Sequence, residues 1–253
     1  MTSASWRLVN SGASSPSFNM GCDQALLASD DRRPLLRLYS WDPPALSLGW
    51  FQPLEPFVEL AEREGLELVR RPTGGGAIHH DQELTFCLIA TPGRHGYPVE
   101  VVAGYHWVHG IIRGALAELG AELSFRGDGA PLSVRPQGAT LCFEDTTSLD
   151  LVDGQGRKVV GSAQRRKNGR VLHHGSIPLT PPGLSRASGA LDLACGRPVS
   201  WDEAAETLAR HFATTLGSGV FEPSELSEAE HRAAVEFRAR PDAGRGGRGS
   251  ASD

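Results

Sequence analysis

Long apolar runs and a secretory leader are both absent from the sequence. No stretch approaches the roughly 18 consecutive apolar residues that a membrane-spanning helix needs. The first twenty residues lack the basic start and the apolar core of a secretory signal. We therefore expect a cytoplasmic protein with no membrane partner.

Cysteine is scarce, and an excess of positive charge is missing. The four cysteines, Cys22, Cys87, Cys142 and Cys195, lie far apart and form no CxxC pair, which excludes zinc-ribbon and thioredoxin-like sites. Without a secretory signal a disulfide framework is not expected, so we predict reduced thiols, any of which is a candidate nucleophile. The net charge of -5 counts against a nucleic-acid partner.

The chain has 253 residues, of which 40% are hydrophobic and 22% charged, values typical of a soluble globular protein. It contains no repeat of 20–50 residues. We predict one globular domain over residues 1–240. Residues 241–253 are rich in Gly, Arg and Ser and are predicted to form a disordered tail.

Strand and helix patterns alternate irregularly along the chain, which predicts an α/β or α+β fold with a mixed sheet. We expect a helix capped by Asn19, and others over 58–64, 99–119, 201–216 and 227–240. Strands are expected at 35–41, 45–48, 68–71, 77–80 and 84–90. A turn at 153–156 predicts a hairpin between LDLV and KVVGSA, with VLHHGSIPL pairing next.

Three segments contain candidate binding residues. RRPTGGGAIHHD, residues 70–81, has three glycines that would let the backbone approach a ligand, but a flexible hairpin is an equally good interpretation. It matches neither a GxxxxGK[ST] phosphate loop nor a GxGxxG dinucleotide turn. In KVVGSAQRR the lysine, Lys158, could contact a ligand carbonyl or lie on an edge strand. In LHHGSI the adjacent His173 and His174 would face opposite sides of a strand, so we expect no metal site.

Taken together, in this order and spacing, the three segments resemble the lipoate/octanoate protein-ligase family. NMGCDQALL and LRLYSWDPPALSLGWFQP are also similar to that family's opening, and the resemblance covers residues 6 to 220. It implies the catalytic domain shared with biotin protein ligases and class II aminoacyl-tRNA synthetases, a mixed sheet with helices on one side. It also implies that substrate is bound by Arg71, Thr73, Gly74, Gly75, Gly76, Ala77, His80, Gly161, Ser162, Ala163, His174 and Gly175.

Within the family, the chain is most similar to the octanoyltransferases that use a cysteine nucleophile. QELTFCL after the glycine loop resembles their ELT pattern, where lipoate ligases typically have Gly-Asn, and GSAQRR resembles their GSAQxR form. Cys142-Phe143, the following polar loop and Lys158 look like their cysteine–lysine arrangement. The resemblance therefore implies Cys142 and Lys158 as catalytic residues. Cys22 and Cys87 lie in apolar patterns and are expected in the core.

The implied reaction moves octanoate from acyl carrier protein to a lysine of a lipoyl-domain protein, such as glycine cleavage H protein or a 2-oxoacid dehydrogenase E2 subunit. It would pass through a Cys142 thioester and need no cofactor. Three alternatives stay open: a lipoate–protein ligase using ATP and Mg²⁺, an octanoyl amidotransferase, and a non-catalytic acyl- or carrier-binding paralogue. Two interpretations stay open for a group of basic residues, which could attract acidic partners or form a solvated surface. The group consists of Arg165, Arg166 and Lys167, with Arg70 and Arg71.

Overall fold

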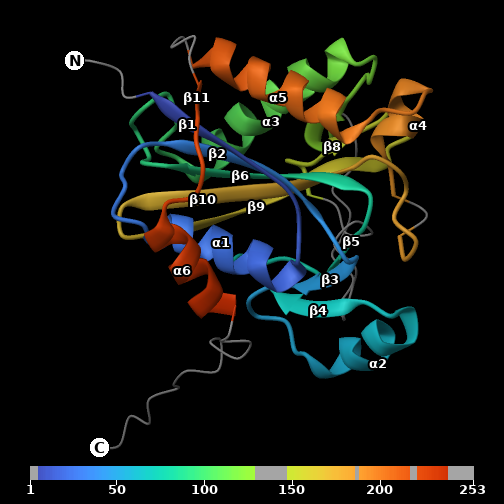
Figure 1. The fold of residues 1–253 in the computed structure, drawn as a ribbon. Coiled ribbons are helices and arrows are strands. Elements are labelled where there is room, and N and C mark those ends of the chain that lie inside the picture. Colours follow the sequence, from blue (N-terminus) through green and yellow to red (C-terminus); the bar gives the residue numbers. More distant parts are fainter. Residues whose placement is uncertain (1–4, 129–146, 186–187, 217–220, 239–253) are drawn as a thin grey trace, which may run out of the picture.

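An eight-stranded mixed sheet forms the centre of the computed structural model, which describes residues 5–128, 147–185, 188–216 and 221–238 (Figure 1). The strand order is β11-β1-β2-β6-β10-β9-β8-β7. The bounds are β1 Trp6–Ser14, β2 Leu35–Trp41, β6 Glu83–Ala90, β7 Ser124–Phe125, β8 Leu151–Val152, β9 Lys158–Lys167, β10 Arg170–Pro178 and β11 Phe221–Pro223. β1 runs parallel to β2 and β11, and the other neighbours are antiparallel. Cys142 and the predicted tail lie outside the described residues.

Helices cover both faces of this sheet, so the expectation of helices on one side was wrong. α1 (Pro16–Ala28) and α6 (Glu228–Arg238) lie on one face, and α3 (Val101–Glu118) and α5 (Trp201–Thr215) lie on the other (Figure 1). A short helix, α4 (Leu191–Cys195), lies near one end. The physical reason is that β6 is buried along its whole length and β2 along nearly all of it. A strand buried on both faces needs a covering layer on each side.

A second, three-stranded sheet holds the glycine-rich segment. Its order is β4-β3-β5, with β3 at Ala45–Leu48, β4 at Glu67–Arg70 and β5 at Ile78–His80. α2 (Glu55–Glu64) packs beside it and ends at Gly65, whose left-handed conformation (φ 65°) confirms the predicted stop. The loop from β4 to β5 contains the three consecutive glycines.

Most of the predicted elements are confirmed, including the hairpin. β8 pairs with β9 across the 153–156 turn, and β10 pairs with β9 in antiparallel register. The Asn19 cap is wrong: α1 begins at Pro16, and the buried Asn19 side chain instead donates to the backbone oxygens of Ser14 and Ser40. β1 was not predicted, because its pattern, WRLVNSGAS, mixes apolar and polar residues without clear alternation.

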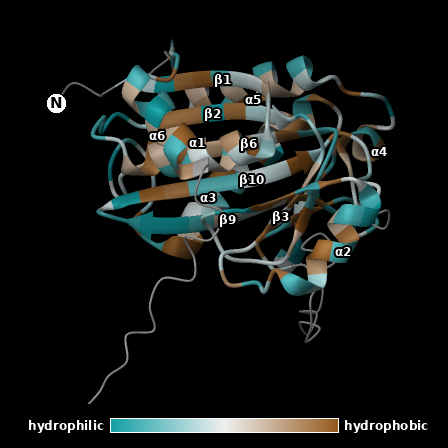
Figure 2. Cartoon of the chain, turned by 60° about the horizontal axis from the view of Figure 1, so that its bottom comes forward, coloured by the Kyte–Doolittle hydropathy of each residue, from teal (hydrophilic) through white to brown (hydrophobic). Residues whose placement is uncertain are grey.

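Two main apolar clusters stabilise the fold, one on each face of the large sheet. The larger cluster includes Val108, Ile112 and Phe212 from α3 and α5, and the second includes Leu26, Tyr39 and Cys87. Figure 2 shows hydrophobic residues along β1 and β2 and hydrophilic residues on β9. Among the described residues, no helix is both long and apolar enough to cross a membrane.

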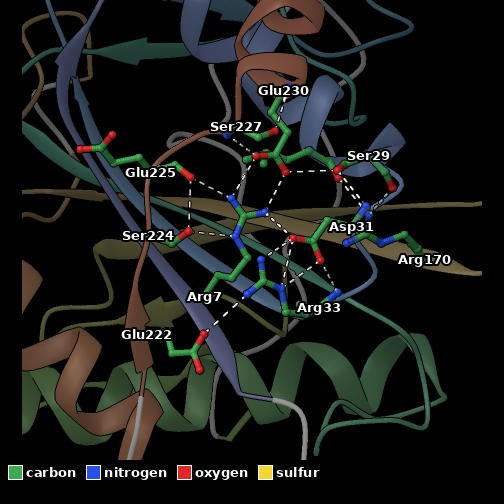
Figure 3. A network of polar contacts seen from close by, with 11 residues as sticks. Arg7, Ser29, Asp31, Arg33, Arg170, Glu222, Ser224, Glu225, Ser227 and Glu230 are labelled. Atoms are coloured by element: carbon green, nitrogen blue, oxygen red, sulfur yellow. Dashed lines mark hydrogen bonds and ion pairs between the residues drawn. The ribbon is translucent and has the colours of Figure 1, made fainter.

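A buried ion pair attaches the C-terminal α6 to the first strand. Arg7 of β1 donates to both carboxylate oxygens of Glu230, at 2.8 and 3.0 Å, and both side chains are about 5% exposed or less (Figure 3). Asp31 and Ser224 also bind Arg7. The result is a polar connection between the two ends of the described chain.

Candidate active site

A pocket lies between α1, strands β2, β6, β9 and β10 of the large sheet, and the glycine loop of the small sheet. It encloses about 510 Å³ of empty space, including its mouth. Nine of the residues predicted to bind substrate line it: Arg71, Gly74, Gly75, His80, Gly161, Ser162, Ala163, His174 and Gly175. Sequence reasoning missed seven others: Met20, Tyr39, Trp41, Ser47, Ile78, Thr85 and Ser176. The predicted segments therefore meet at one place.

Arg71 holds the glycine loop from inside. Its buried guanidinium donates to the backbone oxygens of Ser47, Gly74 and Gly76. Gly76 thus takes part through its carbonyl group, although it is not among the pocket-lining residues. Arg70 binds three backbone oxygens of the 49–52 loop in the same way. Both arginines therefore fix loop backbone. Arg71 is buried and so is not part of an exposed basic surface, whereas Arg70 is half-buried.

The glycine loop and the 49–52 loop are in direct contact. A Cβ placed on Gly49 would lie 2.1 Å from the Gly75 carbonyl oxygen, closer than any side chain tolerates. Gly75 has a φ of 101°, a conformation that favours glycine. Ala77, predicted to bind substrate, is instead fully buried in the apolar core of the small sheet. The loop therefore forms a wall of the pocket, and the segment is no hairpin, because β4 and β5 each pair with β3 and not with each other.

A buried polar chain joins α1 to the glycine loop. Asp23 of α1 accepts a hydrogen bond from His174 Nδ1 at 2.8 Å, and His174 Nε2 lies 2.7 Å from Thr73 Oγ1. Asp23 also pairs with Arg37 at 2.9 Å and Tyr39 at 3.0 Å. Burial disfavours the Asp23 carboxylate, but the His174 hydrogen bond and the Arg37 charge outweigh it and lower the pKa of Asp23. Thr73 is therefore not a pocket-lining residue itself but contacts His174, which is one.

A second polar cluster lies at the most buried part of the pocket. The His80 ring stacks on Trp41 with 3.8 Å between centroids, and its Nδ1 lies 2.9 Å from the Glu83 carboxylate. His80 Nε2 lies 2.7 Å from Ser47 Oγ. Burial raises the pKa of Glu83, but His80 and its hydrogen bond outweigh that effect, so the net pKa is lowered. His80 lines the pocket, whereas His79 is not among the lining residues.

The histidine adjacent to His80 has a different role. His79 is buried and its Nδ1 accepts a hydrogen bond from the backbone of Leu184 at 3.3 Å. It therefore supports the loop after β10. The same alternation explains the ELT segment: Thr85 lines the pocket and donates to the Glu83 carboxylate, while Leu84 packs into the core on the α3 face.

Lys158 lies buried beside the pocket, not on the surface of an edge strand. Its Nζ is 3.0 Å from Asp150 Oδ2, and both side chains are at most 5% exposed. A Cβ on Gly161, a pocket residue, would lie 2.4 Å from Lys158 Cε and 2.8 Å from Nζ. The lysine side chain therefore lies against Gly161. Asp150 was not predicted; the signal available was an acidic residue immediately before β8, the strand that precedes the turn before Lys158.

Ser162 lines the pocket, but its hydroxyl group points toward α3. Ser162 Oγ lies 2.7 Å from His109 Nε2 and 2.8 Å from His173 Nε2. His173 thus faces the α3 side while His174 faces Asp23 on the α1 side, which confirms that the two histidines point in opposite directions. Within the described part of the chain, no group of three or more His, Cys, Asp or Glu side chains could hold a metal ion.

Three of the four cysteines are described, and none lies in the pocket lining. Cys22 and Cys87 are buried, as predicted. Burial raises the pKa of Cys22 to about 11 and that of Cys87 well above its usual value. Burial also raises the pKa of the half-buried Cys195. These thiols are protonated near neutral pH and are poor nucleophiles. Cys142, the predicted nucleophile, lies outside the described residues.

Comparison with known proteins gives the same assignment as the motifs. The pattern of the "Lipoyl protein ligase A/B catalytic domain" family matches residues 15–211. The chain is 36% identical to "Octanoyltransferase LipM" of Kyrpidia tusciae, over 93% of this chain and 95% of that protein. It is 38% identical to the protein of the same name from Bacillus subtilis, over 71% of this chain and 67% of that one.

The fold is similar to those of lipoate ligases. A structure described as a putative lipoate protein ligase from T. acidophilum has a TM-score of 0.74 at 23% identity, covering 93% of this chain and 95% of that chain. A lipoate-protein ligase A bound with ATP has a TM-score of 0.71 at 21% identity, covering 93% and 95%. At these identities the similarity establishes the fold alone. With the family pattern and the full-length relatives, the chain belongs to the lipoyl protein ligase A/B catalytic domain family.

Proposed function

We propose that this chain is an octanoyltransferase of lipoate biosynthesis. The observation that carries the proposal is its similarity, at 34–37% identity and over at least nine tenths of the chain, to several proteins named "Octanoyltransferase LipM". The pocket supports it, because a glycine-walled pocket with Met20, Tyr39, Trp41 and Ile78 in its lining suits an extended acyl chain.

Cys142 is the proposed nucleophile. Its thiolate would attack the thioester carbonyl of the octanoyl donor, forming a new C–S bond while the donor thiolate leaves and takes up a proton. A neutral lysine amine of the acceptor would then attack this second thioester. The C–N bond forms, the C–S bond to Cys142 breaks, and the amine's proton is released. Support comes from elimination: the other three thiols have raised pKa values.

Lys158 is proposed to stabilise the negative charge that develops on the carbonyl oxygen in both steps. Its ammonium is ion-paired with Asp150 and buried beside Gly161 at the pocket wall. A buried, fixed cation is effective because low local polarity strengthens its interaction with a developing oxyanion. Backbone N–H groups of Gly74 to Gly76 are proposed to contribute to the same stabilisation.

Two protein partners follow from this chemistry. We propose acyl carrier protein as the octanoyl donor, and a lipoyl-domain protein, such as H protein or an E2 subunit, as the acceptor. One structural neighbour is described as a bipartite lipoate protein ligase and its E2 lipoyl domain, which supports the acceptor class. Arg166 and Lys167 at the exposed end of β9 are the proposed docking charges.

No cofactor is proposed, because the thioester of the donor is already activated and its conversion to an amide is downhill. A cytoplasmic location is proposed because reduced thiols are typical of that compartment. The ATP-dependent ligase and the amidotransferase are distinguished from this function by their donors.

The test is an acylation assay with purified chain, octanoyl-carrier protein and lipoyl-domain acceptor, without ATP, followed by intact mass. We expect an octanoylated acceptor, and a trapped octanoyl-enzyme when acceptor is omitted. Cys142→Ala should abolish both products. Cys195→Ala is the matched control and should leave both unchanged.

The remaining outcomes identify the alternatives. Transfer that requires free acid and ATP and survives Cys142→Ala would contradict the proposal and indicate the ligase. Transfer only from an octanoylated lipoyl-domain protein would indicate the amidotransferase. Binding without turnover would indicate a non-catalytic paralogue.

A further inference from the structure

A chain of hydrogen bonds runs along the α3 face of the sheet, on the opposite side from His174. It begins at the Tyr97 hydroxyl, 3.1 Å from His173 Nδ1, and passes from His173 Nε2 to Ser162 Oγ at 2.8 Å. It continues from Ser162 Oγ to His109 Nε2 at 2.7 Å and ends where His109 Nδ1 lies 2.6 Å from the Leu149 carbonyl oxygen. Tyr97, His109 and His173 are all buried.

The number of available protons fixes which group donates and which accepts in each of these hydrogen bonds. A carbonyl oxygen only accepts, so His109 Nδ1 must carry its hydrogen. In a neutral imidazole Nε2 is then an acceptor, and the Ser162 hydroxyl must donate to it. That serine has no second proton, so it accepts from His173 Nε2–H, and His173 Nδ1 accepts from the Tyr97 hydroxyl. Every donor and acceptor in the chain is thereby matched.

Burial keeps the Tyr97, His109 and His173 side chains neutral, as this order of donors and acceptors requires. Burial lowers the pKa of His109 to about 4, partly offset by its hydrogen bond to the Leu149 carbonyl group. Burial, with the neighbouring His109, lowers the pKa of His173 well below its usual value. Burial raises the pKa of Tyr97, which therefore stays a donor.

The two hydrogen-bond partners of His109, Leu149 and Ser162, are each next in sequence to a residue that contacts Lys158. Leu149 immediately precedes Asp150, the carboxylate that pairs with Lys158. Ser162 immediately follows Gly161, the residue against which the Lys158 side chain lies. A single imidazole on α3 thus fixes the backbone beside both groups that seat the Lys158 ammonium.

We propose that His109 is a positioning residue for Lys158, which it serves by holding the 149–150 and 161–162 backbone segments at a fixed separation. The inference rests on the catalytic role proposed above for Lys158. His109 contacts neither substrate nor the ammonium in this account. Its effect is to keep Asp150 and Gly161 in the geometry in which the Lys158 side chain lies against Gly161, a pocket-lining residue.

Two variants test the two hydrogen bonds of His109 separately, one to Leu149 and one to Ser162. His109→Asn places an amide nitrogen near the former Nδ1 and retains the donor to Leu149, whereas His109→Gln places one near the former Nε2 and retains the contact with Ser162. His106→Asn is the matched control, since His106 is an exposed histidine of the same helix. If the His109 variants fold poorly, Ser162→Ala removes the central hydroxyl group with little change in volume.

Kinetics give the first measurement. We expect kcat for octanoyl transfer to fall about 10- to 100-fold in both His109 variants, because small displacements of a catalytic group cost rates of this order. The KM for the acceptor should stay within about twofold, because the surface that meets the acceptor is unchanged. His106→Asn should match the unchanged protein.

Lysine labelling gives the second measurement and excludes a merely structural effect. Lys158 and Lys167 are the only two lysines in the sequence, so limited labelling with an amine-reactive reagent yields two lysine sites, which peptide mapping by mass spectrometry separates from each other and from the N-terminal amine. We expect labelling of Lys158 to rise at least several-fold in the His109 variants relative to the exposed Lys167. A lower kcat with unchanged Lys158 labelling would overturn the positioning role.

Imidazole nitrogen chemical shifts give the third measurement, on the unmodified protein at pH 7. The proton order requires an Nδ1–H tautomer for His109 and an Nε2–H tautomer for His173. The reverse pattern, or a charged ring, would overturn the argument. Lys158→Met distinguishes failure of the catalytic proposal: if that variant stays active, Lys158 is not catalytic, whereas the labelling still reports on how the ammonium is seated.

Discussion

At the site, the side chain of Lys158 lies directly against Gly161, a residue that has no side chain. Lys158 crosses Gly161 at a separation that leaves no room for a methyl group. The lysine reaches its carboxylate partner, Asp150, only by lying across that glycine. Gly161 therefore determines where the cation is found, although it carries no functional group.

Gly161→Ala tests this relation. The added methyl group must displace the Lys158 Cε and Nζ atoms, so we expect kcat to fall about 100-fold. The matched control is Gly154→Ala, because a Cβ at Gly154 meets no atom within 4 Å. Single-turnover octanoyl transfer is the measurement. Activity of Gly161→Ala close to that of the control would contradict the proposed seat of Lys158.

The thiols should differ in reactivity. Burial raises the pKa of Cys22 to about 11 and that of Cys87 well above its usual value, so both thiols are almost entirely protonated at pH 7.5. We expect iodoacetamide to modify Cys142 first, Cys195 slowly, and Cys22 and Cys87 only after denaturation. Peptide mapping over time is the measurement, and preferential loss of Cys195 would count against Cys142 as the activated thiol.

At single residues the sequence predicted the site only where the motif itself carried the information. Gly74, Gly161 and His174 were identified because their segments resemble a known family. His109 was missed because nothing near it in the chain indicates its partners, which lie 40 and 53 positions away. Asp150 was missed although it lies only a short turn before Lys158. The direction of the Ser162 hydroxyl group likewise depends on α3, which strand alternation alone does not place.

Among the elements, α6 depends on one buried ion pair for its attachment to β1. Arg7 reaches the Glu230 carboxylate across the end of the sheet (Figure 3). Burial raises the pKa of Glu230, but the hydrogen bond from Arg7 outweighs it, and the net pKa is lowered. A group with a lowered pKa in the folded state stabilises that state at pH values above its unfolded pKa, about 4.3.

Glu230→Gln should therefore destabilise the protein in a pH-dependent way. At pH 7 we expect a loss of about 2 kcal/mol in the free energy of unfolding, the usual size for a hydrogen bond to a charged group. The difference from the parent protein should shrink as the pH falls through the lowered pKa of Glu230. Urea unfolding at several pH values is the measurement.

Glu228→Gln is the matched control on the same helix. Glu228 is exposed and pairs with Arg232 at 3.4 Å, so its replacement should change stability by less than about 0.5 kcal/mol. A Glu230→Gln effect equal to that of the control, or independent of pH, would show that the ion pair does not stabilise α6.

At this scale the sequence predicted most strands and helices within a few residues. The prediction succeeded for β2, β3 and β10 because apolar residues there are bounded by Pro, Gly or Asn. It failed for β1, whose apolar and polar residues do not alternate clearly. The helices were predicted, but their distribution over both faces was not, because coverage of a sheet depends on tertiary packing. The strand order, with β6 between β2 and β10, is likewise not encoded locally.

For the whole molecule, the distribution of charge matters more than its sum. The net charge is -5, yet Arg166 and Lys167 are adjacent and exposed at the end of β9. Local basic groups can attract an acidic protein despite an opposite overall charge. This keeps the proposed docking surface consistent with the composition.

Reversing these charges tests the docking surface. For Arg166→Glu combined with Lys167→Glu, we expect kcat/KM for protein substrates to fall about tenfold at low salt and the difference to shrink near 0.5 M salt, where screening is strong. Arg232→Glu on α6, also exposed, is the control. A loss that does not depend on salt would contradict an electrostatic role.

The neighbouring side chains His173 and His174 have a consequence for how this protein can change during evolution. Each belongs to a different network on a different face of β10. Insertion or deletion of one residue in that strand would exchange their faces and break both networks together. Length differences between this chain and its relatives should therefore be confined to loops, while β10 accepts replacement of residues but no change in their number.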